Sequence, residues 1–212
     1  TLWDMTSYGK VLAATPLVDG SGTQLFAFDI NDNGVISGFV HEDNNPSMEQ
    51  TPAMGWFVDG QLQIATRENP NPDVITRFRD MQIDNDGNLL GYGIEPAEPW
   101  GFYARAVIWP ASGGAIDLVE EFRAISTARA NGIATVDGVL QVVGYAHGRQ
   151  GTFPYLYTGG TLSNLNGLAE GDEPWELTGV NDVNHEGIIC GLGVVGKREI
   201  YAANCLLVPT SE

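Results

Sequence analysis

The segment FDINDNGVISG at residues 28–38 indicates the fold, because it recurs along the chain. It recurs as MQIDNDGNLLG at 81–91 and as VNDVNHEGIICG at 180–191, and a looser copy with a short insertion covers 130–144. The first glycines of the four copies are Gly34, Gly87, Gly138 and Gly187. Their spacings of 53, 51 and 49 residues divide nearly the whole chain into four units.

Each unit also has a second half made of short apolar runs, such as AMGWFV at 53–58 and ARAVIW at 104–109. Trp56 and Trp109 both lie 18 residues past the second glycine of their unit. Asn-Gly, Asp-Gly and Gly-Gly pairs separate the runs, and such pairs supply the positive φ angles of tight hairpins. Each unit therefore predicts four antiparallel strands, and only 118–130 reads as a short helix.

A four-stranded unit repeated at this period is typical of a β-propeller blade. We predict a single all-β domain over 1–212, a four-bladed propeller with four-stranded blades. The repeats cover 25–66, 78–119, 126–165 and 177–208, with 8–15 as a further strand. Because the fourth unit stops after its third strand, we expect the N-terminal strand at 8–15 to complete the last blade and close the ring. A linear solenoid is the alternative, and it leaves this half-blade unexplained.

These motifs resemble a known family. The Ile/Val-Asn-Asp-x-Gly-x-Val/Ile-x-Gly segment, the Ala-x-x-Trp strand and the Gly-Gly-x-x-x-x-Leu turn are similar to the HAF-type extracellular repeat of bacterial secreted proteins. The resemblance covers about residues 25–208, loosens in the third unit, and lacks the aromatic residue in the fourth. It implies secretion and a propeller-like fold, and it transfers no catalytic residues.

The chain is strongly acidic, with 27 acidic and 10 basic residues and a net charge of −17. Such a surface repels phosphate backbones and anionic lipids, so nucleic acid is excluded as a partner. No apolar run approaches the roughly 20 residues of a membrane span, which excludes membrane insertion by a helix. The charge also has a simpler explanation, which is solubility. The first residue is Thr1, from which we expect that an N-terminal segment has been removed.

Cys190 and Cys205 fall on the second and third strands of the fourth unit. A turn centred near Lys197 and Arg198 would place them directly opposite each other, which predicts a disulfide and an extracellular or periplasmic location. Two reduced, buried cysteines are the alternative.

The segment containing Asp29, Asn31 and Asn33 matches the opening of a calcium loop. It lacks the late carboxylate that closes such a site, since the twelfth position is Val40. A hairpin turn whose side chains bond the local backbone is the competing interpretation. No other cofactor is indicated.

Long acidic, proline-rich loops are predicted on one face, with tight turns on the other. Their side chains supply the ligand-binding candidates, which are His41, Glu42, Asp43, Trp100, Tyr103, Asp172 and Trp175. Aromatic residues beside carboxylates suit a sugar-binding or protein-binding rim, and they also serve as loop anchors. His41 and His147 occupy equivalent positions in opposite blades, too far apart to share a ligand.

No nucleophile motif or metalloprotease motif is present, so we expect no enzyme. The function that the sequence favours is a secreted or surface binding module for a glycan or a protein. One alternative is a structural subunit of an extracellular filament or surface layer that self-associates. A polysaccharide-degrading enzyme is the second alternative.

Overall fold

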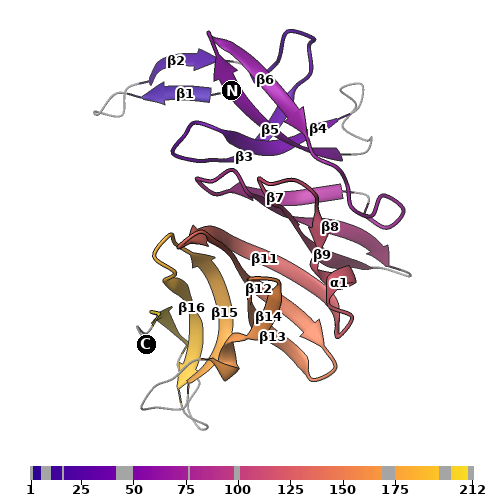
Figure 1. Cartoon of the computed structure of the whole chain (residues 1–212), viewed down its shortest axis with the longest axis vertical. Coiled ribbons are helices and arrows are strands. Elements are labelled where there is room, and N and C mark those ends of the chain that lie inside the picture. Colours follow the sequence, from indigo (N-terminus) through magenta and orange to yellow (C-terminus); the bar gives the residue numbers. More distant parts are fainter. Residues whose placement is uncertain are drawn as a thin grey trace.

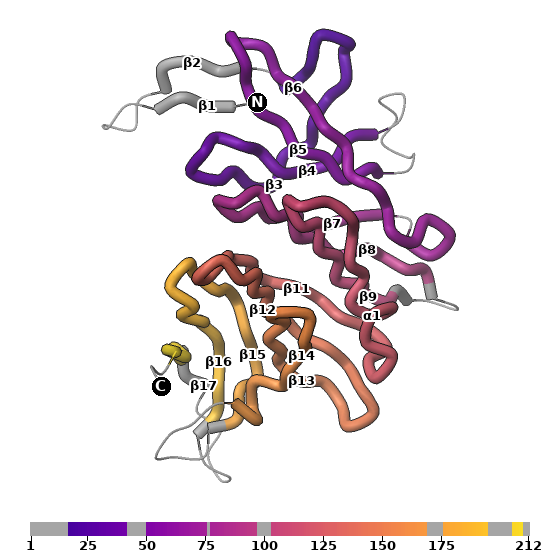
Figure 2. Tube along the Cα trace, in the orientation of Figure 1, coloured from indigo at the N-terminus to yellow at the C-terminus, as the bar shows by residue number. Residues whose placement is uncertain are grey.

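The computed structural model describes residues 2–5, 11–15, 17–41, 50–75, 77–97, 101–168, 175–195 and 202–209. It confirms an all-β protein built of antiparallel sheets, shown in Figures 1 and 2. The first sheet contains β3 (Leu25–Ile30), β4 (Ile36–His41), β5 (Gln50–Val58) and β6 (Gln61–Thr66). The second contains β7 (Arg77–Ile83), β8 (Leu89–Ala97), β9 (Gly101–Trp109) and β10 (Ile116–Asp117).

The third sheet contains β11 (Ile125–Val136), β12 (Val139–Gly148), β13 (Gly151–Thr158) and β14 (Thr161–Asn164). The last contains β15 (Trp175–Val183), β16 (Ile189–Val195) and β17 (Ala202–Leu207). The helical segments are α1 (Leu118–Glu121) and the 3-10 turn η2 (Leu165–Gly167). The helix expected over 118–130 is confirmed only over its first four residues, and residues 125–130 belong to β11.

The turn between the first two strands of a sheet is built in the same way three times. Asn31 Oδ1 accepts hydrogen bonds from the Asn33 and Val35 N–H groups. Asp84 and Asn184 bond the equivalent N–H groups of their own turns. Gly34 completes its turn with a φ of 76°, a conformation that residues with a side chain rarely adopt. The repeated sequence motif is therefore a repeated turn.

Successive sheets pack face to face through alternating strand residues. One face of each sheet bears a cross-strand pair that packs on the next sheet, and we call this the outgoing face. The outgoing pairs of the first three sheets are Ser37–Met54, Leu90–Ile108 and Val143–Leu156. The apolar residues of these pairs pack against the following sheet. Ser37 instead donates a hydrogen bond from its hydroxyl to Met81 O of the second sheet. Apolar cores thus form between consecutive sheets.

In Figure 1 the first sheet lies at the top, the second below it, and the last two side by side at the bottom. The prediction that the N-terminal strand completes the last blade differs from the structure. β2 (Val11–Thr15) pairs with β1 (Leu2–Met5), and the last sheet has three described strands. A hairpin to a strand six residues away closes a far shorter loop than one to β17, and its entropic cost is smaller.

Among the described residues, no helix is long and apolar enough to cross a membrane.

Candidate functional site

The first strands of all four sheets meet at one open pocket of about 550 Å³, which we call the axial pocket. Its lining comes from β3, β7, β11 and β15. The lining residues are Phe28, Asp29, Asp80, Met81, Gln82, Ile83, Ile133, Asp182 and Val183. The pocket therefore depends on how the whole array of sheets is arranged, and it presents three carboxylates and an amide.

Each first strand is irregular beside this pocket. The pairing register of β3 with β4 shifts between Ala27 and Asp29, and that of β7 with β8 shifts between Arg79 and Gln82. β11 and β15 shift at equivalent places. A β-bulge bends its strand and redirects side chains, and bulges are enriched beside functional sites. Here they accompany the polar side chains that line the pocket.

Hydrogen bonds connect one first strand to the next around the pocket. Asp29 Oδ2 accepts from the Ile83 N–H at 3.1 Å, which joins β3 to β7. Gln82 Nε2 donates to Asn131 O at 2.8 Å, and Asn131 Nδ2 donates to Val180 O at 2.6 Å. The polar residues at the pocket thus also hold neighbouring sheets together.

Asp80 has an unusual backbone for a residue inside a strand, with a φ of 49°. Asp59 and Asp137 share this conformation, but both lie in tight turns where it is ordinary. The Asp80 carboxylate accepts a hydrogen bond from Arg129 Nη2 at 3.0 Å, and the Arg129 guanidinium lies over the Tyr92 ring. Strained residues of this kind cluster at functional sites.

Asp182 is exposed at the pocket. Desolvation by the surrounding protein raises the pKa of Asp182, the hydrogen bond from the Val183 N–H opposes this, and the nearby charge of Asp29 adds to the rise. β11 approaches β15 closely beside Asp182 because residue 132 is a glycine. A Cβ at Gly132 would lie 2.6 Å from Asp182 Oδ1 and 2.7 Å from Asp182 Cα. The effect of the Asp29 charge on the pKa of Asp182 places carboxylates of the first and last sheets near each other.

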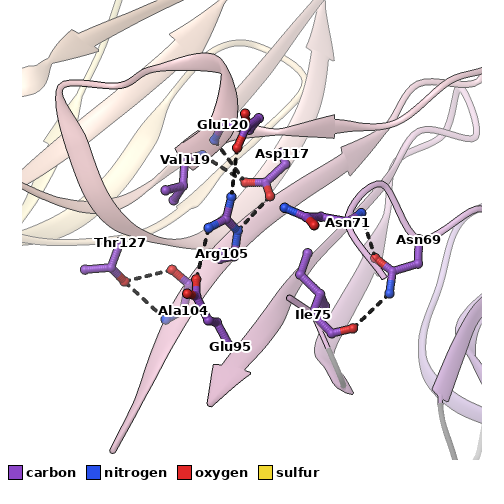
Figure 3. A network of polar contacts seen from close by, with 10 residues as sticks. All are labelled: Asn69, Asn71, Ile75, Glu95, Ala104, Arg105, Asp117, Val119, Glu120 and Thr127. Carbon is purple, nitrogen blue, oxygen red and sulfur yellow. Dashed lines mark hydrogen bonds and ion pairs between the residues drawn. The ribbon is translucent and has the colours of Figure 1, made fainter. Parts of the chain in front are cut away.

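A second polar cluster surrounds Arg105 in the second sheet (Figure 3). Its Nε donates to Asp117 Oδ2 at 2.7 Å, and its Nη1 donates to Glu95 Oε2 at 3.0 Å. Burial lowers the pKa of Arg105, but the hydrogen bonds and charges of Asp117 and Glu95 outweigh it, and the pKa lies above its ordinary value. Asp117 also caps α1 by accepting from the Val119 N–H. This cluster is internally satisfied and holds the second sheet to the helix.

The ligand-binding candidates predicted on loops have different environments in the structure. His41 ends β4 and is 7% exposed, with its ring edge-on to Phe26 and Phe39, so it does not lie on an exposed rim. Tyr103 on β9 is 49% exposed. Trp175 begins β15. Glu42, Asp43, Trp100 and Asp172 lie outside the described residues.

The calcium candidates have other roles. Asp29 accepts from the Ile30 and Ile83 N–H groups, and Asn31 organises its turn. Asn31 Nδ2 and Asn33 Nδ2 donate to Asp84 O and Asn85 O in the second sheet. These contacts confirm the turn interpretation and add a role between sheets. Within the described ranges, no group of three or more His, Cys, Asp or Glu side chains is placed to hold a metal ion.

The expected disulfide is absent, and both cysteines are free. The hairpin register pairs Cys190 with Leu206 and Gly191 with Cys205, one position away from the prediction. A one-residue offset directs two side chains to opposite faces of a sheet. Cys205 accordingly packs in the core between the last two sheets, and the structure gives no support to a location inferred from a disulfide.

No family model matches the chain, and the search of curated proteins found no match either. The sequence did contain a signal for the axial pocket that motif reasoning missed. Asp29, Gln82 and Asp182 each lie five residues before the first glycine of their unit. A polar side chain at this fixed position of the first strand marks residues that line this pocket.

Proposed function

We propose that this chain is a non-catalytic binding module, secreted or at a cell surface, that binds a glycan in the axial pocket. The observation that carries the proposal is the convergence of Asp29, Asp80, Gln82 and Asp182 from three sheets on one open pocket. Carboxylate oxygens accept hydrogen bonds and an amide both donates and accepts, which suits the many hydroxyl groups of a sugar. Binding sites on rigid scaffolds combine shape with a few such polar groups.

The proposal includes the arrangement of the sheets as a four-bladed propeller of the HAF type. In support, residues of both the first and the last sheet line the axial pocket, and a linear stack would hold these sheets apart. The extracellular or periplasmic location rests on the resemblance to secreted repeats. The first and last sheets share this pocket without packing face to face, since Leu206 on the outgoing face of the last sheet is 68% exposed.

The test is titration with a panel of neutral oligosaccharides, followed by calorimetry and by amide shifts in NMR spectra. We expect binding that Asp182→Asn weakens, while Asp59→Asn on a distant turn leaves it unchanged. The same oligosaccharides should remain intact after long incubation, since the proposal is of binding without turnover. Equal binding by both variants, or cleavage of the sugar, contradicts it.

A second candidate function, self-association through an open sheet, is favoured by one observation. The outgoing pair of the last sheet is Cys190–Leu206, and Leu206 is 68% exposed. Its counterparts Met54, Ile108 and Leu156 pack on a following sheet. Among the described strands, none pairs with the free edge of β17, and such edges attract other chains.

Light scattering over a range of protein concentrations tests this candidate. Self-association predicts a mass that rises with concentration and that Leu206→Asp returns to about one chain. Exposed Val139 in the third sheet offers a matched control, because Val139→Asp should leave the assembly intact. A constant mass of one chain excludes the candidate.

A further inference from the structure

A second polar pocket, of about 400 Å³, lies at the start of β5 and the end of β6, away from the axial pocket. Two residues of β5, the last residue of β6 and the segment that leads to the second sheet form it. The lining residues are Gln50, Thr51, Thr66, Arg67, Glu68, Asn69 and Pro72. We call it the Arg67 pocket, since Arg67 is the only cation among these described lining residues.

Arg67 is a half-buried guanidinium without an ion pair. Its Nε is buried and has no hydrogen-bond partner, and its Nη2 lies 3.1 Å from Met54 Sδ, a weak acceptor. Among the described arginines, only Arg105 and Arg129 form ion pairs, and the remaining unpaired ones apart from Arg67 are exposed. Of the arginines that the structure describes, Arg67 is thus the one half-buried guanidinium left unmatched, in a chain with 27 acidic residues.

The wall of the pocket is fixed by contacts that do not involve a ligand. The Arg67 N–H donates to Pro52 O at 2.6 Å, and the buried Trp109 Nε1 donates to Glu68 O at 2.7 Å. Asn69 Nδ2 donates to Ile75 O, and Asn69 Oδ1 accepts from the Asn71 N–H (Figure 3). A preformed wall lowers the entropic cost of binding.

The free polar groups indicate what the pocket can hold. Gln50 Oε1 accepts from the Phe78 N–H, which leaves its amide N–H₂ group as a donor. The Thr51 and Thr66 hydroxyls add donors and acceptors. A guanidinium binds a carboxylate through two parallel hydrogen bonds, and its two Nη groups can form such a pair when Nε is buried. Glu68 supplies an acceptor that suits hydroxyl groups and repels a second carboxylate.

We propose that the Arg67 pocket binds a sugar acid, a uronate whose single carboxylate pairs with Arg67 and whose hydroxyls bond the surrounding amide, hydroxyl and carboxylate groups. The site is separate from the axial pocket and does not depend on the function proposed there. The carboxylate would give the Arg67 guanidinium the ion pair that it lacks, and Pro72 would offer an apolar surface to the sugar ring.

The test is calorimetric titration of the full chain with glucuronate and with galacturonate, with glucose and acetate as comparison ligands. We expect at least one uronate to bind, glucose to bind at least about tenfold more weakly, and acetate to bind more weakly than the uronate. Equal affinity for glucose overturns the role of Arg67. Acetate binding as tight as uronate binding overturns the sugar assignment, and no uronate binding overturns the site.

Variants locate the site. Arg67→Met should weaken uronate binding at least about tenfold, and Arg67→Lys should give an intermediate loss because it keeps the charge without the planar fork. Arg149→Met removes an exposed arginine and changes the net charge equally, so it serves as the matched control. Circular dichroism and thermal melting establish that each variant is folded. Unchanged uronate binding by a folded Arg67→Met chain contradicts the proposal.

Discussion

Ile108 and Leu206 occupy equivalent positions in the second and last sheets, but one side chain is buried and the other is exposed. Each belongs to the outgoing pair of its sheet, Ile108 opposite Leu90 and Leu206 opposite Cys190. Ile108 is fully buried against the third sheet, and Leu206 is 68% exposed. In a repeat protein the burial of a residue thus depends on whether a further unit follows, because each unit covers its neighbour.

The largest effect we expect comes from truncating these two residues. Ile108→Ala should lower the free energy of unfolding by about 2–5 kcal/mol, because it leaves a cavity in a packed junction. Leu206→Ala should change it by less than about 0.5 kcal/mol, since the side chain is mostly in water. Urea unfolding of dilute samples measures both. A large loss in Leu206→Ala at low concentration would mean that this face is already covered within the chain.

A smaller effect is expected at the junction of the last two sheets. Gly132→Ala places a Cβ against the backbone of Asp182 and Val183, and should cost about 1–3 kcal/mol because that junction must open. Gly20→Ala is the control, since a Cβ there meets nothing within 4 Å. Thermal melting of the two variants compares them. Equal melting temperatures would show that β11 and β15 do not approach as described.

The alkylation rates of Cys190 and Cys205 compare the accessibility of the two faces of the last sheet. Burial raises the pKa of Cys205, and the neighbouring Cys190 adds to the rise, so less of the reactive thiolate forms at pH 8. We expect an alkylating reagent to modify Cys205 several-fold more slowly than Cys190 in the folded chain, as followed by peptide mass spectrometry. Both cysteines should react at equal rates in denaturant without a reductant. If the cysteines react only after reduction, they form a disulfide, which contradicts the pairing register of β16 and β17.

The smallest effect concerns Asp182. A folded carboxyl group with a raised pKa binds protons more tightly than the unfolded chain, so its ionisation disfavours folding. Asp182→Asn should therefore raise the unfolding free energy at pH 7 by less than about 1 kcal/mol, because solvent screens an exposed site. The gain should shrink as the pH falls towards about 4, where the unfolded carboxyl group also binds its proton. If the gain in unfolding free energy persists at pH 3, it does not come from the ionisation of Asp182.

The sequence predicts strands and turns well here because both depend on local physics. Asn31 and Gly34 specify their turn through contacts within five residues, and the motif repeats wherever that turn does. The limits of the sheets, such as Leu25 to Thr66, follow from these turns.

Register is less predictable, since it depends on loops of different length. Trp56 and Trp109 are equivalent by spacing, but Ala53 pairs with Gly38 while Val107 pairs with Gly91, which shifts the second sheet by one residue. Trp109 is consequently buried in a junction and Trp56 only partly covered. The same one-residue error produced the expected disulfide. The pockets were missed because their residues are distant in sequence and meet only after the sheets pack.

The distance between the first and last sheets tests the central claim, that four sheets surround one axial pocket. Spin labels at Asp32→Cys and Glu186→Cys, with Cys190→Ser and Cys205→Ser, report it by pulsed electron paramagnetic resonance. Packed sheets lie about 10 Å apart, so a linear stack separates the first and fourth by about 30 Å or more. An arrangement of the four sheets around one pocket predicts a distance well below this, and a control pair at Asp32 and Asp86 reports the distance between adjacent sheets. A distance of about 30 Å or longer would contradict the axial pocket and the function proposed for it.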